Sequence, residues 1–126
     1  MKSQPRFHEY ILDEGYRALA GRSDADNDEL AFHVGRTEDW WFHIKGMPGS
    51  HVVLIRGDRP EPGRDALKKA AAIAAWHSKA RDGGVVAVIG TKLRYVKKPR
   101  GAKPGTVTVS RETVFKVRPA LPEEQL

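Results

Sequence analysis

The chain has 126 residues, a size that suits one domain with its own hydrophobic core, and no linker or internal repeat divides it. Its 40% apolar and 30% charged residues are ordinary for a globular protein. The absence of cysteine excludes disulfides, thiolate metal sites and cysteine nucleophiles. No apolar run approaches the ~18 residues of a membrane span, and the N-terminus lacks the apolar core of a signal peptide, so we expect a cytoplasmic protein.

The net charge of +6 is unevenly distributed along the chain. Residues 1–40 are acidic, with five Lys/Arg against nine Asp/Glu. Residues 83–111 hold no acidic residue and seven basic ones, which are Lys92, Arg94, Lys97, Lys98, Arg100, Lys103 and Arg111. A long window of one sign indicates a polyanion such as nucleic acid as a partner. The alternative is a solvated basic hairpin that only keeps the protein soluble.

The first half of the chain predicts strands with one short helix between them. Residues 7–12 and 16–21 are apolar-rich runs around an Asp-Glu-Gly turn and predict a hairpin. Residues 27–34 predict a short helix that stops at a glycine. Residues 39–45 and 50–56 have strand composition, and the turn between them contains two glycines and a proline.

The second half begins with the clearest element, an alanine-rich helix predicted over residues 65–80. Residues 84–90 are a continuous apolar run, which is typical of a buried strand. Residues 93–98 and 106–110 alternate and bracket a loop rich in proline and glycine, so they predict a strand–loop–strand ribbon. Residues 113–117 predict a last strand.

The order of these elements predicts an α+β fold, with a mainly antiparallel sheet and one long and one short helix packed against it. We expect one domain over residues 1–126, with its core at residues 7–117. Residues 118–126 are expected to form a flexible tail.

The predicted strand at 39–45 has two unlike faces, because successive side chains of a strand point in opposite directions. One face is apolar and comprises Trp40, Phe42 and Ile44. The other face combines an aromatic ring with polar groups and comprises Asp39, Trp41, His43 and Lys45. If this second face is presented to solvent, Trp41 can stack on a base while His43 and Lys45 meet phosphates. The alternative is that Trp41 is half-buried and His43 satisfies a local hydrogen bond.

The turn KGMPGSH resembles a phosphate-binding loop only loosely. Its glycines let backbone N–H groups converge on an anion, and Lys45, Ser50 and His51 could add donors. It lacks the Gly-Lys-Ser/Thr ending of a P-loop and leads into a strand, so a tight hairpin turn is the stronger alternative. Ser50 and His51 are adjacent and point to opposite faces, and no GxSxG elbow is present, which argues against a hydrolase. The histidines match no metal-ligand spacing, so we expect no metal site. No other cofactor is expected.

The basic ribbon, residues 92–103, is the second candidate surface. It interleaves cations with one aromatic ring on a flexible hairpin, and these residues are Lys92, Arg94, Tyr95, Lys97, Lys98, Arg100 and Lys103. Alternation would place Arg94 on the face of Lys92 and opposite Tyr95. Cations in this arrangement can follow a phosphate backbone. No pattern for reading bases is visible, which favours binding to a shape or to single strands.

The segment DWWFHIKGMPGSHVVL closely resembles the signature of the NFACT-R domain, the RNA-binding module of NFACT proteins in ribosome-associated quality control. Three other segments are similar to parts of the same family, in the same order: GRSDADNDEL, AAAIAAWHSKAR and VAVIGTKLRYVKKPRGAKPGTVTV. Together they cover nearly the whole chain, residues 7–117.

The resemblance implies an RNA-binding protein without enzymatic activity of its own, with tRNA or ribosomal RNA as partner and the ribosome as a further one. By matched position it implicates Asp39, Trp41, His43, Lys45, Pro48, Gly49, Ser50 and His51. The basic ribbon adds the cations Lys92, Arg94, Lys97, Lys98, Arg100 and Lys103 to this expected RNA-binding set. Neither a membrane nor a small-molecule substrate is expected.

The sequence contains only the R region of the family, so we expect a free-standing RNA-binding protein without the ability to extend nascent chains. The alternative is a protein-interaction module that docks on a ribosomal protein or another acidic partner. A basic surface fits either kind of partner.

Overall fold

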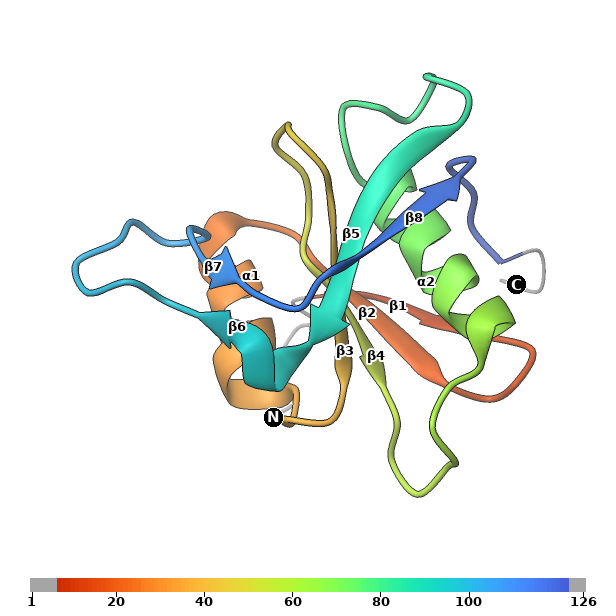
Figure 1. The fold of residues 1–126 in the computed structure, drawn as a ribbon, viewed down its shortest axis with the longest axis horizontal. Coiled ribbons are helices and arrows are strands. Elements are labelled where there is room, and N and C mark those ends of the chain that lie inside the picture. Colours follow the sequence, from red (N-terminus) through yellow and green to blue (C-terminus); the bar gives the residue numbers. More distant parts are fainter. Residues whose placement is uncertain (1–6, 123–126) are drawn as a thin grey trace, which may run out of the picture.

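The computed structural model describes residues 7–122, and an antiparallel sheet lies at its centre (Figure 1). The strands of this sheet are β1 Phe7–Ile11, β2 Arg17–Gly21, β3 Trp40–Ile44, β4 Val52–Ile55, β5 Val86–Lys92 and β8 Thr113–Val117. They follow the spatial order β1-β2-β4-β3-β5-β8. A separate two-stranded sheet pairs β6 Val96–Lys97 with β7 Thr108–Val109. The helical elements are α1 Asp24–Glu29, the π-helical turn η1 Leu30–Val34, α2 Arg64–Trp76 and the 3-10 turn η2 Leu93–Tyr95.

The predicted α+β class is confirmed. Every strand pair among the described residues is antiparallel, and the long helix α2 and the short helix α1 pack against the sheet. The hairpin predicted at 7–12 and 16–21 is confirmed as β1 and β2. Gly15 in its turn has a φ of 95°, a conformation that glycine adopts without steric cost.

The first helix begins earlier than predicted, at Asp24. Ser23 caps it, because its hydroxyl oxygen accepts the N–H of Asp26 at 3.1 Å and so satisfies a donor that the first turn leaves free. The chain continues as η1 and stops at the predicted glycine, where the N–H of Gly35 donates to the carbonyl of Leu30 at 2.9 Å.

The long helix α2 ends at Trp76, before the end of the predicted range. His77 leaves the helical conformation, with φ −90° and ψ 42°. The hydroxyl of Ser78 donates to the carbonyl of Ala75 at 2.7 Å, and Ser78 also forms an isolated β-bridge with Gly49. Pairing with the turn after β3 therefore draws the chain out of the helix.

The strand predicted over residues 93–98 is wrong for its first half, which forms η2 instead. The N–H of Leu93 donates to the carbonyl of Asp39 at 2.9 Å, and the N–H of Arg94 donates to that of Thr37 at 3.1 Å. These bonds bend the chain toward the loop before β3. The alternation of faces assumed for this segment therefore does not hold.

Both faces of the large sheet are covered (Figure 1). Helix α2 covers one face, where the buried side chains include Phe42, Ile44, Ala70, Ala71 and Ala74. The other face is covered by α1, η1 and the β6–β7 pair, and its cluster, the second core, comprises Leu19, Leu30, Ala31, Trp41, Val53, Leu93 and Val96. The prediction that Trp41 is presented to solvent is therefore wrong.

The segment after β8 returns along α2, where the N–H of Ala120 donates to the carbonyl of Ala72 at 3.2 Å. Leu121 packs against the core under α2. The end of the expected tail, residues 123–126, lies outside the described residues. No helix within residues 7–122 has the length and apolar composition needed to cross a membrane.

Candidate nucleic-acid interface

Trp41, the ring expected to stack on a base, lies in the second core. Its side chain is 2% exposed. It stacks on the imidazole of His43 with ring centroids 5.9 Å apart, and its indole N–H donates to Nδ1 of His51 at 3.1 Å. A base could reach this ring only if the cover of α1, η1 and the β6–β7 pair opened. In the observed conformation, Trp41 stabilises the fold and offers no free platform.

His43 and His51 lie side by side behind that cover, with ring centroids 5.4 Å apart and ring planes nearly perpendicular. Burial lowers the pKa of His51 to about 4, and the neighbouring His43 adds to this effect. Burial also lowers the pKa of His43. Both imidazoles are therefore mainly neutral at pH 7, and they bring no positive charge to a phosphate.

Asp39 is also buried, at 4% exposure, and its carboxylate joins two loops. Its Oδ2 accepts the N–H of Arg36 at 2.9 Å, and its Oδ1 accepts the N–H of Arg56 at 2.9 Å. Both carboxylate oxygens thus hold backbone segments that flank β3 and β4. The signature position of Asp39 is explained by this structural link.

The signature turn, residues 45–50, is fixed to the end of α2. The N–H of Ser50 donates to the carbonyl of His77 at 3.0 Å, and the Ser50 hydroxyl donates to that of Gly21 at 2.7 Å. A Cβ at Gly49 would lie 2.9 Å from Cβ of Ser78, so only glycine allows this approach. Among the expected binding residues of the signature, Lys45 and Pro48 are exposed, and the others are buried or half-buried.

Three cations of the basic ribbon are held in ion pairs within the chain. Nζ of Lys92 lies 2.9 Å from Oε1 of Glu38, and this hydrogen bond raises the pKa of Lys92. Arg94 pairs with the same carboxylate at 2.6 Å. Nζ of Lys98 lies 3.0 Å from Oδ2 of Asp28. Each of these cations would have to leave a carboxylate in order to contact a phosphate.

The outer part of the basic ribbon carries exposed cations that form no ion pair among residues 7–122, and these are Lys97, Arg100 and Lys103. Lys97 lies at the end of β6, while Arg100 and Lys103 lie on the loop between β6 and β7, which projects from the body of the molecule (Figure 1). Its base is attached to α1, because the N–H of Gly105 donates to Oδ1 of Asp28 at 3.0 Å. The ribbon therefore presents free positive charge from a fixed base.

Three further cations surround the signature turn, although no sequence pattern singled them out: Arg22, Lys79 and Arg81. They line the same hollow as Gly49 and Ser50. Two of them, Lys79 and Arg81, lie shortly after α2 in the Ser-Lys-Ala-Arg sequence, which is part of the family resemblance. Their convergence with Arg22 depends on the fold.

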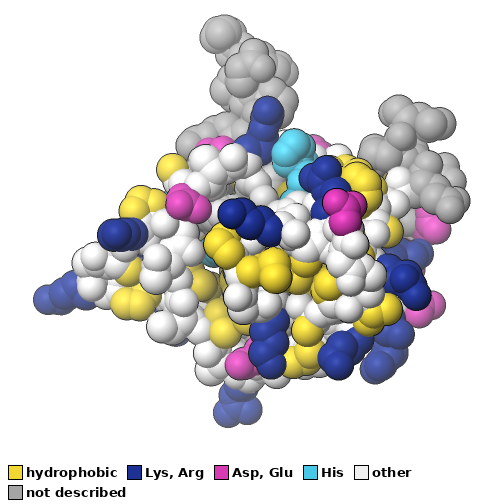
Figure 2. Space-filling view, turned by 90° about the horizontal axis from the view of Figure 1, so that it is seen from above, with side chains coloured by type: hydrophobic (Ala, Val, Ile, Leu, Met, Phe, Trp, Pro, Cys, Tyr) yellow, Lys and Arg dark blue, Asp and Glu magenta, His cyan; other side chains and the backbone are white. Residues whose placement is uncertain are grey.

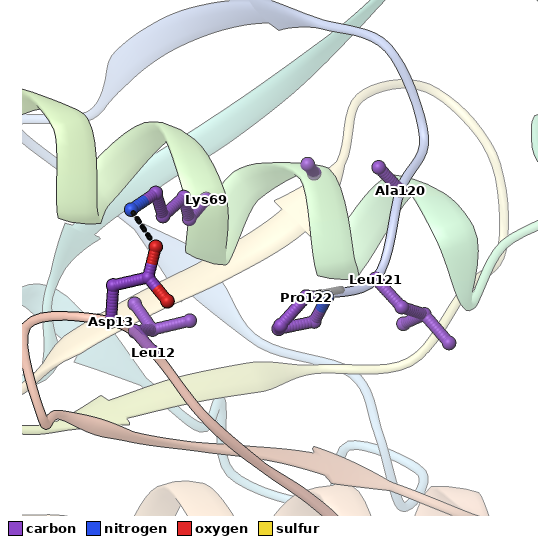
Figure 3. A pocket seen from close by; sticks show the side chains of 7 residues that line it. Leu12, Asp13, Lys69, Ala120, Leu121 and Pro122 are labelled. Carbon is purple, nitrogen blue, oxygen red and sulfur yellow. Dashed lines mark hydrogen bonds and ion pairs between the residues drawn. The ribbon is translucent and has the colours of Figure 1, made fainter. Parts of the chain in front are cut away.

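A separate pocket of about 260 Å³ lies between α2 and the segment after β8, and Figure 3 shows it from close by. Its lining is mainly apolar, with Leu12, Ala72 and Leu121. Among the described residues that line it, Lys69 is the one cation, and it pairs with Asp13 at 3.4 Å. The pocket thus offers little attraction to a polyanion. Within residues 7–122, no group of three His, Cys, Asp or Glu side chains is arranged to hold a metal ion.

Comparison with known proteins gives one family and several relatives. Residues 6–111 match the family described as NFACT protein RNA binding domain. The Rqc2 homolog RqcH of Bacillus subtilis is 46% identical over 112 residues, which cover 88% of this chain and 19% of that protein. The Rqc2 homolog RqcH of Streptococcus pneumoniae is 35% identical over 121 residues, covering 94% of this chain and 21% of that protein. The chain therefore spans only a small part of the curated relatives that it matches.

One solved structure supports the same likeness in three dimensions. It is the C-terminal part of the fibronectin/fibrinogen-binding protein from Streptococcus suis, with a TM-score of 0.85 and 34% sequence identity. The match covers 94% of this chain and 47% of that chain. The similarity thus extends over the sheet, its two covers and the basic ribbon.

Proposed function

This chain belongs to the NFACT protein RNA-binding domain family, and from that membership we propose that it binds RNA as a cytoplasmic protein in translation or ribosome quality control. The proposed ligand is tRNA or ribosomal RNA. The observation that carries the proposal is the free positive charge of Lys97 at the end of β6 and of Arg100 and Lys103 on the projecting loop that follows it. These cations can neutralise phosphates without breaking an ion pair of the fold.

The chemistry of this loop favours contacts with the RNA backbone. Lysine and arginine attract phosphates of any sequence, whereas base reading requires polar groups fitted to base edges. The aromatic ring within the ribbon, Tyr95, lies under the guanidinium groups of Arg94 and Arg111, at 5.9 and 5.5 Å from its centroid. We therefore propose recognition of RNA shape or of a single strand, with little dependence on sequence.

The same geometry supports a role without catalysis. A serine–histidine pair needs a hydroxyl that donates to a free imidazole nitrogen. The Ser50 hydroxyl instead donates to the carbonyl of Gly21 at 2.7 Å, and Nδ1 of His51 accepts the indole N–H of Trp41 at 3.1 Å. Neither group is positioned as a nucleophile or its base.

The test is RNA binding by fluorescence anisotropy, with a labelled tRNA and a labelled single-stranded RNA. We expect the wild type to bind, and the combined variant Lys97→Glu, Arg100→Glu, Lys103→Glu to bind much more weakly with an unchanged unfolding midpoint. The matched control reverses Lys68 and Lys116, which are exposed on α2 and β8. Equal affinity of the wild type and the ribbon variant would contradict the proposed surface, and no binding by the wild type would contradict the function.

The second candidate function is docking on an acidic protein. It is favoured by the likeness to the Streptococcus suis protein, which is named for binding fibronectin and fibrinogen. Free cations on a projecting loop also fit such a partner. Co-sedimentation with ribosomes before and after nuclease treatment distinguishes the two functions. Nuclease should release a chain that is bound to RNA, whereas a chain that is bound to a protein should stay with the ribosomes.

A further inference from the structure

A second cationic surface, the signature-turn pocket, lies where the turn after β3 meets the end of α2. It is a hollow of about 390 Å³, within the range of ~300–1,000 Å³ typical of ligand pockets. Arg22 lines it from the end of β2, Gly49 and Ser50 from the signature turn, and Lys79 and Arg81 from the segment after α2. Figure 2 views the molecule from this end, where Lys and Arg side chains lie around a surface histidine.

The three cations of this pocket are available to a ligand. Arg22, Lys79 and Arg81 are exposed, and none of them forms an ion pair with another part of the described chain. Among the described residues that line this hollow, Asp24 alone carries a carboxylate. Its walls thus carry three positive charges against one negative charge.

Arg81 is held in place by contacts that leave part of its guanidinium group free. Its Nε donates to the carbonyl of Trp76 at 2.9 Å, and the group lies 4.6 Å from the centroid of the Trp76 ring. Its terminal nitrogens donate no hydrogen bond to another residue within residues 7–122. A guanidinium group that is oriented in advance loses less entropy when it binds a phosphate with two parallel N–H donors.

The histidines beside the pocket experience these charges. His8 and His77 stack with ring centroids 4.5 Å apart, and the Tyr10 hydroxyl lies 2.7 Å from Nε2 of His77. Burial lowers the pKa of His77 to about 4, with further contributions from His8 and Arg81. Burial lowers the pKa of His8 as well, and the charge of Arg22 adds to this effect. Burial is the main cause of both shifts, and the charges of Arg22 and Arg81 add a smaller contribution in the same direction. These same charges would attract an anion.

The pocket is also continuous with the basic ribbon. A smaller hollow of about 190 Å³ shares Asp24 and Gly49 with it and extends to Pro104 and Gly105. At the boundary the two surfaces are close, because a Cβ at Gly105 would lie 3.0 Å from Oδ1 of Asp24. One strand of RNA could therefore contact both surfaces by crossing the start of α1.

We propose that the signature-turn pocket binds a phosphate group of the RNA between Arg22, Lys79 and Arg81, beside the path of the strand along the basic ribbon. This assignment rests on the proposed RNA binding and names a second contact for it. It also assigns a role to the Pro-Gly-Ser turn within this chain. The close contact of Gly49 with Ser78 holds the turn against the segment after α2 that carries Lys79 and Arg81.

The experiment compares the affinity of a labelled single-stranded RNA for the wild type, for Lys79→Gln, and for the combined variant Arg22→Gln, Lys79→Gln, Arg81→Gln. Losing one phosphate contact weakens binding to single-stranded RNA about fourfold at about 0.15 M salt. We expect about this loss for the combined variant and a smaller loss in the same direction for Lys79→Gln. Lys68→Gln on the outer side of α2 is the matched control and should bind as the wild type does. Lys79 forms no ion pair within residues 7–122, so Lys79→Gln should leave the fold intact, and its result does not depend on the stability of the triple variant.

The outcomes separate this inference from the proposed function. RNA binding that both pocket variants leave intact, while the ribbon variant loses it, overturns this inference alone. A wild type that binds no RNA overturns both. Poly-glutamate can be added as a competitor at the same concentration of negative charge as the RNA. If it displaces the RNA, the pocket recognises negative charge alone, and the assignment to a phosphate is overturned.

Discussion

The signature segment, residues 39–51, and the outer part of the basic ribbon use their polar groups in opposite ways. In the signature, the Asp39 carboxylate, the Trp41 indole and the Ser50 hydroxyl all bond to other parts of the chain. In the ribbon, Lys97 and Arg100 extend into solvent without an ion-pair partner in the described chain. The signature therefore joins loops, strands and the end of α2, while free charge is presented elsewhere. A distinctive motif thus marks this fold more directly than it marks the ligand contact.

The largest effect expected from this difference is on stability. Trp41→Ala removes a ring that is 2% exposed and should lower the free energy of unfolding by about 3–5 kcal/mol. Lys45→Ala, on the same stretch of chain but exposed, should change it by less than about 0.5 kcal/mol. Denaturant unfolding measures both. A Trp41→Ala protein of normal stability that no longer bound RNA would make Trp41 a ligand contact and contradict its structural role.

The next effect concerns the loops around β3. Asp39→Ala leaves the backbone N–H groups of Arg36 and Arg56 without their acceptor. Each N–H group that no water molecule reaches should lower the free energy of unfolding by about 1–3 kcal/mol. Asp58→Ala, in the exposed loop after β4, is the control. Thermal unfolding and RNA affinity should be measured together. A normal melting temperature with lost RNA binding would place Asp39 at the ligand.

Acid should weaken the fold through the buried histidines. The folded-state pKa of His51 is about 4, below its ordinary value of 6.5, so the unfolded chain binds more protons between these values. Stability is therefore complete above pH 6.5 and falls with decreasing pH, by about 1.4 kcal/mol for each pH unit down to pH 4.

The pKa of His77 is lowered in the same way, so His51 and His77 both contribute to the loss of stability of the wild type with decreasing pH. His51→Gln should flatten the dependence of the denaturant midpoint on pH between pH 7 and pH 5, and the exposed His33→Gln should not. Parallel profiles for His51→Gln and the wild type would contradict the assigned burial of this ring.

The smallest effect is expected where the ribbon meets α1. Asp28→Asn removes the charge that pairs with Lys98 and keeps an oxygen for the N–H of Gly105. Stability should fall by about 0.2–1 kcal/mol, as for an exposed ion pair. RNA affinity should rise by about fourfold if Lys98 then meets a phosphate. Weaker RNA binding in Asp28→Asn would mean that the ion pair orients Lys98 for the ligand.

The sequence predicted the sheet well, because strands and hairpins leave local patterns. Alternation correctly separated Trp40, Phe42 and Ile44 from the opposite face of β3. Alternation could not show what covers that opposite face. The second core is completed by Leu30 and Leu93, which lie outside the strand predicted at 39–45. The burial of Trp41 follows from those distant contacts.

The candidate site shows the same limit. The ion pair between Lys98 and Asp28 joins residues far apart in the chain, so composition alone counted Lys98 as free charge. Arg22 and Lys79 meet only because β2 and the end of α2 reach the same end of the sheet. The expected RNA-binding residues stay predictions, and the geometry now divides them into internal links and exposed cations.

The salt dependence of RNA affinity tests the central claim most directly, namely that exposed cations outside the buried signature make the contact. For a single-stranded RNA, log Kd should be measured against log salt for the wild type and for the variant Lys97→Gln, Arg100→Gln, Lys103→Gln. We predict a slope that is flatter by about 2 in the variant, since each neutralised phosphate contributes about 0.7. An unchanged slope, with unchanged affinity, would contradict the claim.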